Sequence, residues 1–165
     1  MITLGIDPGT ARLGYGVVQA ADDPIVLDFG VIETPATATM PARLAGLYDI
    51  VTELIAQHQP NVLAVEQLFF ARNVTTAIAV GQARGVVLLA AAQANIDVAE
   101  YSPSEVKHAV VGYGKADKIQ MQEMVRIILG LEHAPRPDDA ADALAIALCH
   151  VQRASFSAST GQRSW

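Results

Sequence analysis

Residues 2–18 read ITLGIDPGTARLGYGVV, and this stretch decides the fold. Apolar side chains alternate with other residues up to Asp7, which is the pattern of a strand with a buried face. Pro8-Gly9 then marks a turn. Residues 13–18 and 25–32 predict two further strands, so the chain begins with three consecutive strands.

The later segments place helices between strands. Apolar residues at helical spacing predict a helix over residues 42–58, and the apolar run 62–65 predicts a strand covered on both faces that ends at Glu66. An Ala-rich segment, residues 75–95, predicts a long buried helix. The remaining predicted elements are a strand over 96–101, a helix that opens with a capping box at Ser102 and Glu105, and helices over 118–129 and 138–151. This order implies an α/β fold with a mixed sheet flanked by helices.

The composition is that of one globular domain. The 165 residues are 52% hydrophobic and 17% charged, so the chain can bury a core without disulfides or metals. No segment reaches about 20 unbroken apolar residues, and no signal peptide or disulfide is indicated, so we expect a cytoplasmic protein with no membrane contact. We expect residues 1–153 to form a single domain and the Ser-rich residues 154–165 to form a disordered tail.

The net charge of −6 opposes binding to nucleic acid, but the charges are unevenly distributed. Residues 1–66 carry eight acids and two bases, whereas residues 67–126 carry six bases and five acids. All three lysines lie between Lys107 and Lys118. This clustering indicates a basic surface for phosphate, although a solvated surface with lysines placed by chance gives the same pattern.

Four carboxylates fall where a solvated acid is not expected. Asp7 and Glu66 each close an apolar strand, and they meet at one sheet edge if these strands are neighbours. Asp139 and Asp142 stand three residues apart, on one face of the last predicted helix. Buried acids repel one another unless a cation joins them, and hard oxygen ligands favour Mg²⁺ or Mn²⁺ over zinc. The pattern therefore predicts a metal site.

Simpler interpretations of single residues stay open. Asp7 can serve as a turn residue, and Asp138 and Asp139 are ordinary residues for a helix N-terminus. Phe69 suits either core packing or the stacking of an unpaired base. His150, at the end of the last predicted helix, suits an interaction with the helix dipole.

Four separate segments together resemble one known family. They are IDPGTARLGYGVV from Ile6, VEQLFFARNVTTAIAVGQARGV from Val65, PSEVKHAVVGYGKADK from Pro103, and PDDAADALAIALCH from Pro137. In this order they resemble the RuvC family of bacterial crossover junction endodeoxyribonucleases, or Holliday junction resolvases. The resemblance runs from about Met1 to Arg153.

The resemblance implies a ribonuclease-H-like nuclease that acts in DNA recombination and repair. Such an enzyme resolves a four-way (Holliday) DNA junction by cutting two strands at symmetric positions, and it leaves 5′-phosphate and 3′-hydroxyl ends. The resemblance also implies a homodimer, two Mg²⁺ ions per subunit that Mn²⁺ can replace, and the branch-migration proteins RuvA and RuvB as partners.

The same motifs carry the family's functional residues onto this sequence. The implied catalytic acids, which are also the metal ligands, are Asp7, Glu66, Asp139 and Asp142. This leaves Asp138 outside the set. Lys107 is implied as a catalytic residue near the scissile phosphate. The residues implied at the DNA are Lys118, Phe69 and Arg72.

Two other functions compete with the nuclease. Residues 7–10, Asp-Pro-Gly-Thr, followed by a glycine-rich hairpin, resemble the first phosphate loop of actin-like phosphotransferases, but the chain is too short for their two lobes. A protein that binds junctions without cutting them would share the basic segment. The acidic set opposes this second alternative, since a pure binder would gain affinity for DNA by losing negative charge.

Overall fold

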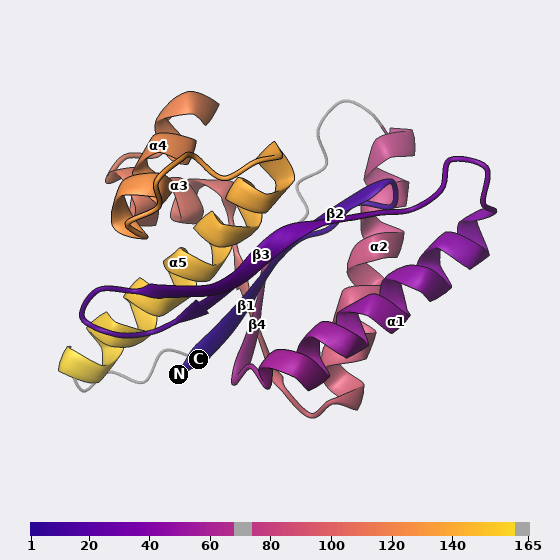
Figure 1. The fold of residues 1–165 in the computed structure, drawn as a ribbon, viewed down its shortest axis with the longest axis horizontal. Coiled ribbons are helices and arrows are strands. Elements are labelled where there is room, and N and C mark those ends of the chain that lie inside the picture. Colours follow the sequence, from indigo (N-terminus) through magenta and orange to yellow (C-terminus); the bar gives the residue numbers. More distant parts are fainter. Residues whose placement is uncertain (68–73, 161–165) are drawn as a thin grey trace.

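The structure, a computed structural model, describes residues 1–67 and 74–160. These residues form one five-stranded sheet with helices on both faces (Figure 1). The strands are β1 (Ile2–Asp7), β2 (Arg12–Gln19), β3 (Ile25–Glu33), β4 (Val62–Glu66) and β5 (Asp97–Tyr101). The helices are α1 (Met40–His58), α2 (Val74–Gln93), α3 (Pro103–Val111), α4 (Lys118–Ile128) and α5 (Asp138–Thr160). Within the described residues, none of these helices has the length and apolar character needed to cross a membrane.

The strands lie across the sheet in the order β3-β2-β1-β4-β5. β1, β2 and β3 pair antiparallel, which short turns between consecutive strands allow. β4 runs parallel to β1, and β5 runs parallel to β4, with α1 and α2 supplying the crossovers that parallel pairing requires. The structure thus confirms the three consecutive strands, the covered strand before Glu66 and the mixed sheet.

The helices form two layers around the sheet (Figure 1). α1 and α2 cover one face, where Leu47 and Val87 join Leu4 of β1 in one apolar cluster. α3, α4 and α5 cover the other face, where Val106 and Leu144 belong to a second cluster. Because both faces are covered, β1 and β4 are buried along their length and only their end residues are partly exposed.

The helices that carry the two predicted functional lysines begin at capping boxes. Ser102 Oγ accepts a hydrogen bond from the Glu105 N–H, and the Glu105 carboxylate accepts one from the Ser102 N–H at 2.8 Å, as predicted. Asp117 and Gln120 form a second box at the start of α4. Each box satisfies N–H groups that a helix leaves unpaired, and so fixes where the helix begins.

Helix α5 lies very close to β1 and β2 because glycines face it. A Cβ atom on Gly5 would lie 2.2 Å from the carbonyl oxygen of Ala143, and one on Gly14 would lie 2.0 Å from that of Asp139. Only a residue without a side chain fits at such distances. Gly14 pairs with Asp7 in the register of β1 and β2, so this contact places the start of α5 beside the end of β1.

Helix α5 is longer than the sequence predicted. It includes residues 154–160, so the prediction of a disordered tail is wrong for these residues, and the rest of that tail lies outside the described residues. The segment is polar and lacks periodicity, but it contains neither Gly nor Pro before Gly161, so nothing in it stops the helix.

Nearer the middle of α5, Cys149 is fully buried, and this burial raises the pKa of its thiol to about 12.

We predict that Gly14→Ala destabilises the fold by about 1–3 kcal/mol or more, because the new methyl group has to displace the backbone of α5. The measurement is the free energy of unfolding in denaturant. Gly46→Ala is the matched control, since nothing lies within 4 Å of a Cβ at Gly46 inside α1. That variant should gain about 0.5–1 kcal/mol, as alanine does over glycine in helices. Wild-type stability for Gly14→Ala would contradict the close contact.

Candidate active site

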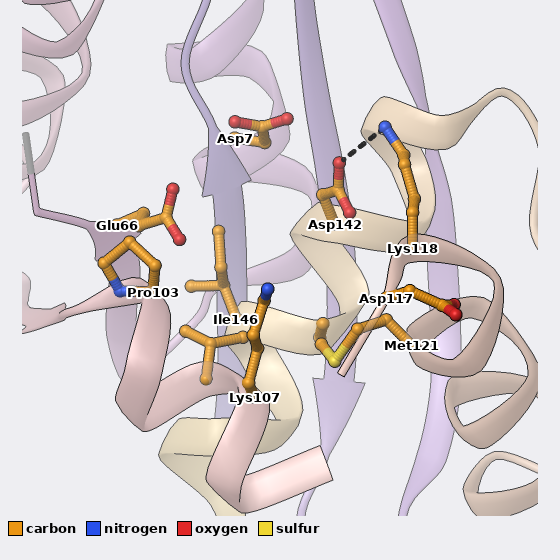
Figure 2. Close-up of a pocket in the computed structure, with 11 residues that line it drawn as sticks. Asp7, Glu66, Pro103, Lys107, Asp117, Lys118, Met121, Asp142 and Ile146 are labelled. Carbon is orange, nitrogen blue, oxygen red and sulfur yellow. Dashed lines mark ion pairs between the residues drawn. The ribbon is translucent and has the colours of Figure 1, made fainter. Parts of the chain in front are cut away.

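Asp7 and Glu66 end two neighbouring parallel strands. β1 and β4 pair through Ile6 and Val65, the residues directly before the two acids. The carboxyl ends of parallel strands lie at the same edge of a sheet, so both carboxylates emerge there (Figure 2). The condition set by the sequence, that these two strands be neighbours, is therefore met.

A pocket of about 260 Å³ lies at this edge of the sheet (Figure 2). Its charged lining residues are Asp7, Glu66, Asp142, Asp117, Lys107 and Lys118. Its apolar wall consists of Pro103, Val106, Met121, Ala145 and Ile146. The lining thus comes from the sheet and from all three helices of one layer. It brings together three of the four predicted acids and both predicted lysines.

Asp7 is the most strongly perturbed acid of the site. Desolvation by burial, followed by the negative charges of Asp142, Glu66 and Asp139, raises its pKa to about 7. An acid surrounded by acids keeps its proton more tightly, because ionisation would add another like charge in a poorly solvated place. A cation bound among these groups would remove the cause of the shift.

Glu66 and Asp142 are perturbed in the same direction. Burial raises the pKa of Glu66, the charge of Asp142 raises it further, and Lys107 opposes the change. Burial also raises the pKa of Asp142, with Lys118 opposing. In Figure 2 the Lys107 side chain rises from α3 and points toward the acids of the pocket. The two lysines therefore offset only part of the negative charge.

Lys118 bridges two carboxylates at the rim of the pocket. Its Nζ lies 3.4 Å from Asp142 Oδ2 and 3.2 Å from Asp138 Oδ2. Desolvation lowers the pKa of Lys118, but the contacts with Asp138 and Asp142 outweigh it, so the pKa is raised overall. Lys118 is 53% exposed, which leaves its ammonium accessible to a ligand.

Asp139 lies three residues before Asp142 on α5, but it is not among the residues that line the pocket. It lines the adjoining hollow with Arg12, Arg136 and Lys118. Its charge still raises the pKa of Asp7 and of Asp142, so it belongs to the same electrostatic cluster. The prediction for Phe69 and Arg72 concerns residues outside the described ranges.

The donor set fits a hard divalent cation. Every candidate ligand is a carboxylate, the ligand type that Mg²⁺ and Mn²⁺ prefer, and burial leaves Asp7 short of solvent. No three Asp, Glu, His or Cys side chains among the described residues are already grouped closely enough to hold an ion together. Asp142 faces Lys118 instead (Figure 2). Metal binding at this set therefore requires the carboxylates to draw together.

A group of contacts that the sequence did not reveal fixes α3 against α5. The Tyr101 hydroxyl hydrogen-bonds His150 Nδ1 at 2.7 Å, and Arg153 pairs with Glu105 while its guanidinium stands 5.5 Å from the centre of the Tyr101 ring. These contacts hold the helix that carries Lys107. His150 lies inside α5 and faces Tyr101, so the proposed dipole role at a helix end is wrong. The capping box at Glu105 was the only sequence signal near this group.

We predict that Asp7→Asn stabilises the metal-free protein at about pH 8. The pKa of Asp7 rises from 3.8 to about 7 on folding. The protonated acid therefore stabilises the fold by about 4 kcal/mol below about pH 4, and this stabilisation is lost as the pH rises through about 7. Asn does not ionise, so the variant should not lose stability in this way. Denaturation in EDTA at several pH values measures it.

The exposed acid Asp22 supplies the control for this experiment. Asp22→Asn should follow the wild-type dependence on pH. If Asp7→Asn also follows it, the acid is not held among repelling charges. Added Mg²⁺ should raise the stability of the wild type more than that of Asp7→Asn, because the variant lacks a ligand.

Comparison with known proteins identifies the family of this chain. The family model "Crossover junction endodeoxyribonuclease RuvC" matches residues 3–150. The crossover junction endodeoxyribonuclease RuvC of Thermomicrobium roseum is 57% identical over 152 residues, 92% of this chain and 93% of that protein. The RuvC of Chloroflexus aggregans is 58% identical over 155 residues, 93% of this chain and 94% of that protein.

A solved structure shows the same fold. The structure of Thermus thermophilus RuvC in complex with a Holliday junction substrate has a TM-score of 0.90 and 41% sequence identity, and the match covers 95% of this chain and 96% of that one. This likeness confirms the predicted ribonuclease-H-like mixed sheet. With its sequence matched almost from end to end and its acids gathered at the end of β1, the chain belongs to the RuvC family of crossover junction endodeoxyribonucleases.

Proposed function

We propose that this chain resolves four-way DNA junctions by metal-dependent hydrolysis of phosphodiester bonds in two opposed strands. The observation that carries the proposal is one pocket that joins Asp7, Glu66 and Asp142 to Lys107 and Lys118. The Thermus relative, whose structure holds a Holliday junction substrate, supports the choice of DNA. Family membership leaves the actin-like phosphotransferase without support.

The acids hold the metal ions in this proposal. Asp7 would hold the ions together with Glu66 of β4 and the two acids of α5, whose charges all act on Asp7. When bound, divalent ions activate a water molecule and stabilise the leaving 3′ oxygen. We propose two Mg²⁺ ions per subunit, with Mn²⁺ able to replace them, held by Asp7, Glu66, Asp139 and Asp142.

The lysines act on the phosphate. Lys107 points into the pocket beside Glu66, where an ammonium can stabilise negative charge on the phosphate that is cut. Lys118, which is partly exposed at the rim, is proposed to contact the DNA backbone. Phe69 is proposed to stack on an unpaired base and Arg72 to bind the backbone, both by family resemblance.

A homodimer would match the symmetry of the task, since a two-fold axis presents two sites to opposed strands. α2 is the proposed interface. Its Ala83 and Val87 are fully buried, whereas Ile78 and Leu89 are 58% and 50% exposed on another side of the helix. Exposed apolar residues on one helix suit a helix-to-helix contact.

The resemblance further supports action in the cytoplasm with RuvA and RuvB.

The test is cleavage of a labelled four-way junction beside linear duplex of the same sequence, with Mg²⁺ or with EDTA. We expect paired, ligatable nicks in the junction alone, and only with metal. Asp7→Asn should keep junction binding and lose at least about a thousandfold in cleavage rate, because a metal ligand is removed and the basic surface is kept. Tight binding without nicks under any divalent ion would instead identify a junction-binding protein.

We also predict that Leu89→Arg yields monomers in sedimentation experiments, because it places a charge in the proposed apolar interface. Ile127→Arg is the matched control, since Ile127 is 53% exposed on α4. The control should sediment as the wild type does. A dimer that survives Leu89→Arg would exclude this side of α2 as the interface.

A further inference from the structure

Asp138 contacts Lys118 from outside the acidic pocket. Its Oδ2 lies 3.2 Å from Lys118 Nζ, whereas Asp142 Oδ2 lies 3.4 Å away. The ammonium thus stands between two carboxylates. Asp142 lines the pocket, and Asp138 lines the adjoining hollow. Two acids of one helix therefore approach the same lysine from different sides.

Asp138 is itself held in place. Its Oδ1 accepts a hydrogen bond from Gln122 Nε2 at 2.8 Å. Gln122 follows Lys118 by four residues on α4, so one face of that helix presents both side chains to Asp138. Asp138 is also the first residue of α5, where the helix N-terminus favours a negative charge. Groups from two helices thus orient its carboxylate.

We infer that Asp138 is a positioning residue, which together with Gln122 holds the Lys118 ammonium at the rim of the acidic pocket. The inference rests on the proposed function, in which Lys118 contacts the DNA backbone. Asp142 is an expected metal ligand, so its carboxylate would interact with a metal ion as well as with the Lys118 ammonium. Among the described residues, Asp138 forms an ion pair with Lys118 and feels the charge of Arg136, so it can hold the ammonium if Asp142 binds a metal ion.

Asp138 could instead act only through its negative charge. Loss of an acid near the bound DNA would then strengthen DNA binding and would not slow cleavage. Loss of a positioning contact slows cleavage even though the protein becomes less negative. The pair is 53% and 58% exposed, so its loss should change the rate by about two- to fivefold.

The experiment is a double-mutant cycle on single-turnover cleavage of a four-way junction. The variants are Asp138→Asn, Lys118→Ala and their combination, with Asp138→Glu as the conservative replacement. We expect Asp138→Asn to slow cleavage about two- to fivefold without weakening junction binding, and Asp138→Glu to restore most of the rate. In the Lys118→Ala background, Asp138→Asn should have no further effect. The shift of the denaturation midpoint in metal-free protein should be non-additive in the same way.

Glu132→Gln is the matched control, because it removes the same charge from an 89% exposed side chain that has no contact with Lys118 among those described. It should leave the rate unchanged or slightly raised. Two outcomes would overturn the inference, provided that Lys118→Ala itself slows cleavage. One is that Asp138→Asn slows cleavage equally in the wild-type and Lys118→Ala backgrounds. The other is that Asp138→Asn cleaves at the rate of the control. If Lys118→Ala cleaves at the wild-type rate, the proposed role of Lys118 fails, and the inference fails with it. Absence of cleavage by the wild type would reject the proposed function itself.

Discussion

The contact on which the site depends is the close approach of α5 to the β1 and β2 strands. Gly5 and Gly16 are paired across these strands, and both lie against α5 where any Cβ atom would be 2.8 Å or less from the helix. Gly14 extends the same surface to the first turn of α5. A larger residue would lift the helix away from the sheet. The distance between the acids of α5 and Asp7 therefore depends on this close packing of α5 against the glycines of β1 and β2.

This packing holds together charges that would otherwise separate. Burial and mutual repulsion raise the pKa of each of Asp7, Glu66 and Asp142, so the acids oppose the fold that contains them. The apolar clusters on both faces of the sheet stabilise the fold against this repulsion. Stability that is lost at the site is a common feature of enzymes, since the same repulsion favours the binding of cations. Lys107 and Lys118 lie on α3 and α4 and not on the sheet, so their positions depend on how these helices pack against it.

The sequence predicted most helices and strands correctly, and the acids that it singled out also carry a local signal. Asp7 and Glu66 follow apolar strands, and Asp142 interrupts an apolar helix face. Which strands are neighbours is not a local property, so the meeting of Asp7 with Glu66 could only be stated as a condition. The contact of Asp138 with Lys118 joins two helices through tertiary packing, and no spacing in the sequence encodes it. Residues 154–160 were misjudged because a polar segment without glycine or proline can extend a helix that is already formed. Phe69 and Arg72 stay predictions.

The burial of Cys149 has a practical consequence for spectroscopy. It is the only cysteine of the chain, and its thiol has a pKa of about 12. Alkylating reagents attack the thiolate, and both the burial of Cys149 and its raised pKa oppose this reaction near neutral pH. The wild-type protein should therefore react little with maleimide dyes. A cysteine introduced on the surface of α4 would carry a fluorophore or spin label at a single known position, without prior removal of the native thiol.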